Sequence, residues 1–277
     1  MTSGSLLAPK RHEYMRVTHN LHVHSRVSLC AKPGMELDSI VSTAHQAGLD
    51  LIGLSDHIDE ADDPEREALV LANRELVARI ESPVRVLVGT ETTVLSPGKP
   101  AAGEQVREAL DFVSVAVNHY HVPNVEHPTP RTPEGYAAHH LQMIRATVEC
   151  PWVDIVVHPF LHGKLAGIDQ TQVIASYDSA ETVETLRLMA QRDVRMELNP
   201  GHVARSPEFF ARVVGMGRGV GLRFVLGTDA HNPESIAYGE QGLMLLEQIG
   251  LQDSDIALPS RVLSRVEDAT FRGCSKA

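Results

Sequence analysis

Short apolar runs rich in β-branched residues alternate with longer helix-like segments along most of the chain. Such runs are typical of strands buried on both faces of a parallel sheet. Seven are present: Val17–His24, Leu49–Ser55, Val84–Thr90, Phe112–Val117, Val153–Val157, Val194–Leu198 and Arg223–Gly227. Seven βα repeats without a clear linker predict an α/β fold, a barrel close to the (β/α)8 type. In such barrels the chemistry lies at the C-terminal ends of the strands.

The segments between these runs have the marks of helices. In "DDPEREALVLANRELVARI", Asp63 is a candidate N-cap and Pro64 suits the first helical position. The predicted apolar stripe of this helix consists of Leu69, Leu76, Val77 and Ile80. Further helices are predicted at Leu37–Ala47, Pro133–Val148, Gln172–Gln191, Pro207–Gly215 and Pro233–Ile249, with a polar helix at Pro259–Phe271. Ser96–Gln105 and Asn118–Thr132 are expected to be long loops.

Size and charge limit the organisation and the partners of the chain. With 277 residues, 43% of them hydrophobic, we predict one domain over 1–277, with an N-terminal extension at 1–15 and a helical C-terminal extension at 250–277. The net charge of −11 and the absence of any lysine or arginine block argue against nucleic acid or an anionic membrane as the main partner. The sequence contains no run of about 18 apolar residues, so no transmembrane helix is predicted.

Cysteine usage and the N-terminus indicate the compartment. The three cysteines, Cys30, Cys150 and Cys274, are widely spaced and odd in number, so they do not suggest a disulfide framework. The N-terminal apolar stretch is too short for a secretion signal. We therefore expect a cytoplasmic protein.

Every predicted strand delivers residues of the metal-ligating type at its C-terminal end. They are His22 and His24, Asp56 and His57, Glu91, His119 and His121, His158, Glu197 and Asn199, and Asp229 and His231. One such histidine is usually a hydrogen-bonded core or loop residue. Many histidines and carboxylates gathered at one end of a barrel are different, because burying each unpaired polar or charged group costs several kcal/mol. Divalent cations remove this cost, and imidazole with carboxylate suits Zn, Mn or Fe.

The pattern therefore predicts a multinuclear metal site of two or three divalent ions. Glu91 is a candidate bridge between two of them. Paired cations activate water and bind the oxygens of a phosphoryl group, so the predicted chemistry is metal-assisted hydrolysis, with phosphate esters favoured.

The motifs "NLHVHS", "LSDHID", "GTE", "NH", "VVHP" and "GTDAHNP", in this order, resemble those of the PHP (polymerase and histidinol phosphatase) family. The resemblance extends from about Val17 to Ile249. It implies a distorted (β/α)7 barrel that holds two or three metals and hydrolyses phosphate monoesters or diesters.

The resemblance also implies roles for individual residues. His22, His24 and Asp229 correspond to ligands of a first metal, which Glu91 bridges to a second. His119 and His158 correspond to ligands of the second metal, and His57 and His231 to ligands of the third. Asp56, in the "DH" pair, is expected to orient an imidazole.

The stretch "ELNPGHVARSPEFFARVVGMGRGVGLRFVLGTDAHNPESIAYG" is similar to the C-terminal part of histidinol phosphatases, in which a basic loop helps to hold the substrate phosphate. Arg205 is the main candidate for this role, and Lys164 and Arg131 are others. His162 is slightly preferred to His121 as the general acid for the leaving oxygen. The expected catalytic residues are thus Asp229, His162 and Arg205.

Two positions depart from the family pattern. Asn20 stands where the family usually has aspartate, and its carbonyl is expected to serve as the acceptor that holds a ligand histidine. Cys30 stands six residues after His24, where histidinol phosphatases tend to have a histidine or an acidic ligand. Either the cluster is dinuclear, or Cys30 joins it as a thiolate, or Asp59 or Glu36 completes it.

Several functions fit these observations. The leading hypothesis is a phosphomonoesterase acting on a small phosphorylated metabolite, since no inserted cap domain is evident. A phosphodiesterase acting on a nucleotide or cyclic phosphate is second. An iron-dependent oxidase or oxygenase could use the same ligand set, and a non-catalytic metal-binding module is a fourth class. The sequence indicates neither the substrate nor the oligomeric state.

Overall fold

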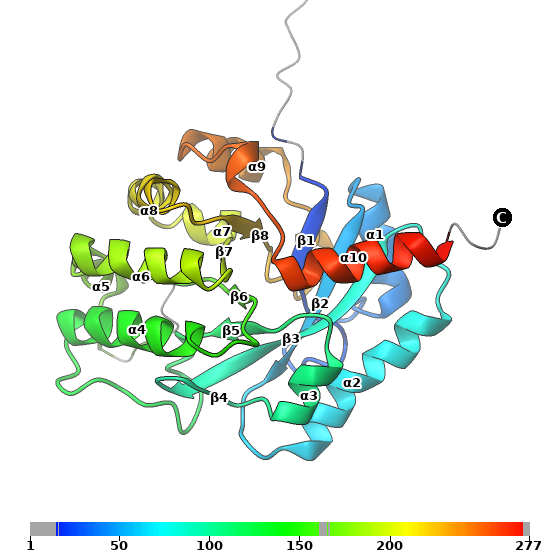
Figure 1. Cartoon of the computed structure of the whole chain (residues 1–277), viewed down its shortest axis with the longest axis horizontal. Helices are drawn as coiled ribbons and strands as arrows, with labels where there is room; N and C mark the ends of the chain where they lie inside the picture. The colour runs from blue at the N-terminus through cyan, green and yellow to red at the C-terminus, as the bar shows by residue number, and fades with distance from the viewer. Residues whose placement is uncertain (1–14, 16, 161–164, 166, 274–277) are drawn as a thin grey trace, which may run out of the picture.

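Seven parallel strands form the central sheet of the computed structural model, which describes residues 15, 17–160, 165 and 167–273 (Figure 1). In spatial order they are β1 (His19–Val23), β2 (Leu51–Ile58), β3 (Arg85–Ser96), β5 (Ser114–Ala116), β6 (Ile155–Val156), β7 (Arg195–Leu198) and β8 (Phe224–Leu226). A short strand, β4 (Lys99–Pro100), pairs antiparallel with the end of β3. Spatial order follows chain order, as expected for successive βα units.

The two edges of this sheet meet. The N–H of His24 donates to the carbonyl of Ala230 at 2.9 Å, and the N–H of Ala230 donates to the carbonyl of His22 at 3.2 Å. The backbone N–H of Leu226 in β8 donates to Nε2 of His19 in β1 at 3.2 Å. These contacts bring the seven-stranded sheet nearly to closure as a TIM-like barrel, so the predicted fold class is confirmed.

Helices lie between successive strands and surround the barrel (Figure 1). They are α1 (Leu37–Gln46), α2 (Pro64–Arg79), α3 (Glu104–Ala109), α4 (Pro133–Val148), α5 (Gln170–Ala175), α6 (Ser179–Gln191), α7 (Pro200–Val203), α8 (Pro207–Gly219) and α9 (Glu240–Gln248), with 3-10 turns η1 (Pro233–Ser235) and η2 (Asp253–Asp255). The last helix, α10 (Ser260–Gly273), confirms the expected C-terminal helix. No helix in the described part of the chain is both long and apolar enough to span a bilayer.

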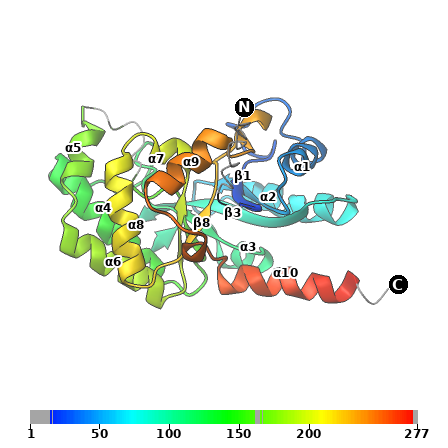
Figure 2. The ribbon, with the colours of Figure 1, turned by 90° about the horizontal axis from the view of Figure 1, so that it is seen from above.

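The N-terminal end of the barrel is filled with apolar side chains and covered by α10 (Figure 2). Val262 of α10 belongs to the same buried cluster as Leu21, Phe112 and Val225. Phe112 occupies the space beside Gly53 and Gly89, where an added Cβ would lie 2.6 and 2.5 Å from its ring. This end is therefore a packed core, and the opposite end is left for polar residues.

Three details of the predicted secondary structure are wrong. The helix predicted at Gln172–Gln191 is divided into α5 and α6, because Asp178 accepts the backbone N–H of Glu181 at 2.9 Å and starts a new helix. The helix predicted at Pro233–Ile249 is divided into η1 and α9, because Gly239 adopts a positive φ of 68°. Within Ser96–Gln105, expected to be a loop, the chain forms β4 and enters α3.

The predicted apolar face of α2 is also partly wrong. Its capping is confirmed, because the helix begins at Pro64 and Asp63 accepts the N–H of Arg66 at 3.0 Å. However, Leu69 and Leu76 are 52% and 39% exposed. The buried residues of α2 are Val70 and Asn73, because the helix is turned to bring Asn73 against a buried carboxylate described below.

Candidate metal centre

All eight side chains predicted to ligate metal lie at the C-terminal end of the barrel, where the other seven surround Glu91. One oxygen of Glu91, Oε1, lies 2.6 Å from Nε2 of His158 and 3.3 Å from Nε2 of His119. The other, Oε2, lies 3.4 Å from Nε2 of both His22 and His24. A single buried carboxylate on β3 thus faces imidazoles that come from β1 and from the loops after β5 and β6.

The remaining members complete this arrangement. Oε2 of Glu91 lies 3.1 Å from Nδ1 of His57 on β2. Asp229, just after β8, places Oδ1 3.0 Å from Nε2 of His24. The backbone carbonyl of Asp229 lies 2.8 Å from Nδ1 of His231, so the free nitrogen of His231 is Nε2. Asp229 adopts a positive φ of 55°, a conformation that aspartate and asparagine tolerate better than most residues.

The ligand-type atoms fall into three groups, each with its members within 4.8 Å of one another. Two of these groups contain Glu91. The groups are His22, His24, Glu91 and Asp229; His57, Glu91 and His119; and His24, Cys30, His57 and His231. The first group matches the first metal expected from the family resemblance. The second group differs from the expected one, because it contains His57, which was expected at the third metal, and lacks His158, whose Nε2 contacts Glu91 directly.

The hydrogen bonding of these buried atoms fits bound cations. Oε2 of Glu91 and Nδ1 of His57 are both buried and form no hydrogen bond within the described part of the chain, although they are 3.1 Å apart. The Nε2 atoms of His22 and His24 lie 3.2 Å apart. Nitrogen and carboxylate lone pairs that converge in a buried site are costly unless they are satisfied, and divalent cations can satisfy them.

The carboxylates and imidazoles of the cluster shift one another's pKa. Burial lowers the pKa of His22, but the carboxylates of Glu197, Asp229 and Glu91 outweigh burial and hold this pKa well above its usual range. Burial raises the pKa of Glu91, yet the imidazoles of His57 and His22 outweigh it and hold this pKa well below its usual range. Burial lowers the pKa of His57 to about 4. Ionised carboxylates next to a neutral imidazole are a donor set that attracts cations.

Glu197, at the end of β7, fixes the orientation of His22. Its Oε1 lies 2.7 Å from Nδ1 of His22, so Nε2 of that ring faces Glu91. Its Oε2 accepts the backbone N–H of His158 at 2.7 Å. Gly227 provides the space, because a Cβ there would lie 1.9 Å from Oε1 of Glu197.

Asp56 positions His24, a candidate ligand, indirectly through Ser28. Its carboxylate accepts the backbone N–H and the hydroxyl of Ser28 at 3.1 and 2.6 Å and the side-chain amide of Asn73 at 2.7 Å. The hydroxyl of Ser28 lies 3.0 Å from Nδ1 of His24. Asp56 therefore holds the loop after β1, and Ser28 holds the ring.

The amide of Asn20 does not contact an imidazole. Its Oδ1 accepts the backbone N–H groups of His22 and Thr228, at 3.1 and 3.2 Å. Its Nδ2 donates to the hydroxyl of Thr228 at 2.8 Å and to the carbonyl of Ile236 at 2.9 Å. All of its hydrogen-bonding capacity is used to tie β1 to the segment after β8. Aspartate has no N–H to donate to Ile236, so the geometry requires asparagine here.

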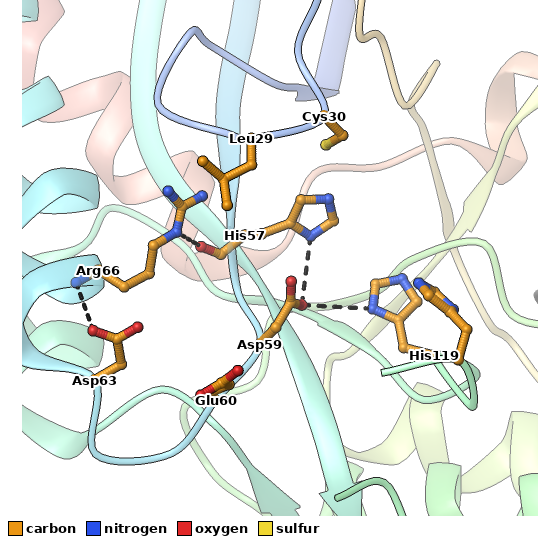
Figure 3. Close-up of a pocket in the computed structure, with 9 residues that line it drawn as sticks. Leu29, Cys30, His57, Asp59, Glu60, Asp63, Arg66 and His119 are labelled. Atoms are coloured by element: carbon orange, nitrogen blue, oxygen red, sulfur yellow. Dashed lines mark hydrogen bonds and ion pairs between the residues drawn. The ribbon is translucent and has the colours of Figure 1, made fainter. Parts of the chain in front are cut away.

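A pocket of about 300 Å³ opens beside the cluster (Figure 3). It is lined by Leu29, Cys30, His57, Asp59, Glu60, Asp63, Arg66, His119 and His121. Arg66 donates Nε–H to the carbonyl of His57 and a terminal N–H to the carbonyl of Val27, both at 2.6 Å. His121 lines this pocket, and burial lowers the pKa of its imidazole.

Arg205 lies at a second opening of about 140 Å³, which it lines together with His202 and Phe160. The ring of His202 packs edge-on against His158 at 5.6 Å between centroids, so this opening also borders the cluster. Arg131 is exposed and lines neither opening. His162 and Lys164 lie outside the described residues.

Sequence reasoning gave no role to several residues that support the site: Glu197, Ser28, Thr93, Arg66 and His202. Glu197 was recognisable only as another acidic residue at a strand end. Thr93 faces Nδ1 of His119 at 2.8 Å and donates its hydroxyl to Asp59 at 2.6 Å. Strand alternation offered a signal here, because Thr93 lies two residues after Glu91 and thus on the same face of β3.

Comparison with solved structures identifies the fold. The chain is similar to histidinol phosphate phosphatase from Lactococcus lactis, solved with zinc, L-histidinol and phosphate, with a TM-score of 0.60 and 17% identity over 88% of this chain and 97% of that one. It is also similar to a protein from Listeria monocytogenes described as a histidinol phosphatase, with a TM-score of 0.58 and 11% identity over 80% of this chain and 98% of that one. No protein-family model and no curated protein matches the sequence. The chain therefore has the fold of histidinol phosphatases, as the motif resemblance predicted.

Proposed function

We propose that this protein is a metal-dependent phosphoesterase of the PHP type that hydrolyses a small phosphate monoester. The observation that carries the proposal is Glu91, a buried carboxylate shared by two groups of potential metal ligands in the fold of histidinol phosphatases. The chemistry of that shared carboxylate matches a bridge between two cations. The bound zinc, L-histidinol and phosphate of the Lactococcus lactis protein support the same chemical class for this chain.

The residues assigned to the metals are those predicted from the motifs. His22, His24 and Asp229 would hold the first cation, Glu91 would be shared with the second, and His119 and His158 would complete the second. His57 and His231 would serve a third. When bound, Zn²⁺, Mn²⁺ or Fe²⁺ would lower the pKa of a water molecule and neutralise charge on phosphoryl oxygens.

The residues of the chain then have separate tasks. Glu197 keeps the proton of His22 on Nδ1, so Nε2 remains available as a ligand. Arg205, at the opening next to His202, pairs with a phosphate oxygen. The leaving oxygen needs a proton, for which His121 in the larger pocket and His162 are the candidates. The overall reaction adds water to the ester and releases an alcohol and inorganic phosphate.

The test begins with metal analysis of the protein purified without oxygen. The protein is then screened for phosphate release from phosphomonoesters, including L-histidinol phosphate and sugar phosphates, with and without added Mn²⁺, Zn²⁺ and Fe²⁺. Cyclic and nucleotide phosphodiesters form the second panel. We expect metal-dependent release from at least one monoester.

Hydrolysis confined to the diester panel would replace the monoesterase proposal with a phosphodiesterase. Failure on every ester, with bound iron and consumption of oxygen, would overturn the proposal in favour of an oxidase. Failure on every ester with full metal loading and no oxygen consumption would favour a binding module.

A further inference from the structure

We propose that Cys30 is a thiolate ligand of the third cation, and that it makes this position prefer Zn²⁺ to Mn²⁺. This inference deepens the proposed function and rests on it, since it concerns one position of the same cluster. Sequence reasoning left the third position open between Cys30, Asp59, Glu36 and no further ligand. The contacts of these three side chains distinguish between them.

Cys30 lies where a ligand is needed. Its Sγ and one nitrogen each of His24, His57 and His231 are all within 4.8 Å of one another. Figure 3 shows Cys30 next to the ring of His57, at the edge of the larger pocket. His24 and His57 also belong to the groups around Glu91, whereas Cys30 and His231 occur in this group alone. The third position therefore depends on Cys30 and His231 most directly.

The loop that carries Cys30 is held on both sides. On one side, Ser28 donates two hydrogen bonds to the buried carboxylate of Asp56 and faces His24. On the other, the N–H of Lys32 donates to the carbonyl of His231 at 2.8 Å. Between these anchors Leu29 is 97% exposed and Cys30 lies at the cluster. The backbone thus fixes Cys30 against His231.

The two alternative residues are occupied elsewhere. Asp59 accepts the hydroxyl of Thr93 at 2.6 Å and lies 3.7 Å from Nδ1 of His57 and 3.9 Å from Nδ1 of His119, beside the second group of ligands. Glu36 lines a separate groove together with Arg26 and Arg79. Cys30 is the one of the three that shares a group with His231.

The donor chemistry sets the metal preference. On binding, the thiol releases its proton to solvent and the thiolate donates an electron pair to the cation. Thiolate and imidazole are both donors that suit Zn²⁺, whereas Mn²⁺ prefers oxygen donors. A histidine or an acidic residue at position 30 would leave the site more open to Mn²⁺.

The first experiment uses cobalt as a spectroscopic substitute for zinc. The Cys150→Ser, Cys274→Ser double variant leaves Cys30 as the sole thiol of the 277-residue chain. Titration of the metal-free protein with Co²⁺, with the bound equivalents measured, should produce a near-ultraviolet sulfur-to-cobalt charge-transfer band. Adding Cys30→Ser should abolish the band and remove one equivalent of cobalt. Absence of the band in the fully loaded parent, or its survival after Cys30→Ser, would overturn the inference.

The second experiment needs no substitution at Cys30. In the same double variant, Zn²⁺ should slow alkylation of Cys30 by iodoacetamide far more than Mn²⁺ does. Equal rates with and without Zn²⁺ would refute ligation. As a third measurement, Cys30→Asp should shift the Zn²⁺-over-Mn²⁺ preference of the third equivalent by about 10-fold towards Mn²⁺, and an unchanged preference would contradict the proposed selectivity.

These measurements test the ligand assignment independently of the proposed function, because they report metal binding and not phosphate release. Phosphate release by a protein without the thiolate band refutes the ligand assignment alone. A clear band in a protein that hydrolyses no ester refutes the proposed phosphoesterase and leaves the ligand assignment standing.

Discussion

The carboxylate of Glu197 lies 2.7 Å from Nδ1 of His22, and its second oxygen accepts the backbone N–H of His158 at the same distance. One buried side chain from β7 therefore positions two candidate ligands that come from β1 and from the segment after β6. Carboxylates behind ligating histidines fix the tautomer and raise the basicity of the ring.

Replacing Glu197 with glutamine should therefore weaken metal binding. The amide can accept from only one of the two N–H groups, so the other loses its partner. We expect a loss of about 10–100-fold in metal affinity, measured by competition with a chelating dye, and partial recovery of activity in excess metal. Glu208→Gln, at an exposed position in the first turn of α8, is the control. Equal affinity in the Glu197 variant and the parent would contradict this role.

Asp229→Asn and His158→Ala should each abolish phosphate release and lower the metal content. Asparagine tolerates the positive φ at position 229, so the first variant removes charge without straining the backbone. Elemental analysis and a phosphate assay measure both effects. His45→Ala, at an exposed position of α1, is the control. Full activity in either variant would show that the site assignment is wrong.

Arg205→Ala should mainly raise KM for a phosphomonoester. Loss of a charge-assisted contact with a phosphate oxygen costs about 1.5–3 kcal/mol, which corresponds to a KM increase of about 10- to 100-fold. Steady-state kinetics measure it. Arg131→Ala is the matched control, because Arg131 is exposed and lines neither opening. If KM does not change, Arg205 does not bind the phosphate.

Asn20→Asp should destabilise the fold although it restores the usual family residue. The new carboxylate would face the carbonyl of Ile236 in a fully buried position, where the amide now donates at 2.9 Å. We expect a loss of about 3 kcal/mol in the free energy of unfolding, measured with urea. In the control, Asn232→Asp, the side-chain oxygen still accepts from Ser235, so little change is expected. Equal stability of the two variants would argue against this account of Asn20.

His19 should make stability depend on pH. Burial lowers its pKa to about 4, and its Nε2 accepts the N–H of Leu226. The unfolded chain therefore takes up this proton first as pH falls, so the stabilisation is present above about pH 6.5 and is lost between 6.5 and 4. The wild type should lose about 3 kcal/mol more than His19→Gln over this range. Urea unfolding at several pH values tests this, and parallel curves for the two proteins would contradict it.

The sequence predicts the barrel and the convergence of the ligand-type side chains at one end of it, because both depend on local patterns. Apolar β-branched runs indicate buried parallel strands, and strands that all run parallel end at the same rim. The motif resemblance then selects the ligand-type residues, and the structure brings the other seven around Glu91. None of this requires knowing which side chains touch.

Other features follow from contacts between distant parts of the chain. The face that α2 presents to the barrel is set by the bond from Asn73 to Asp56, so the apolar stripe predicted by periodicity was partly wrong. The pairing of Glu197 with His22 joins residues 175 positions apart. No spacing rule predicts such a pair, because it depends on how β7 and β1 face each other across the barrel.

Asn20 and Cys30 show the difference between what the sequence determines and what only the tertiary structure decides. The sequence by itself determined that both depart from the family pattern at the first strand. Only the tertiary structure decided what they contact. The side-chain amide of Asn20 donates to Thr228 and Ile236, and the loop of Cys30 holds that residue beside His231. The reason is physical, since a side chain's partners are fixed by packing and hydrogen bonding in three dimensions, which residue identity along the chain does not specify.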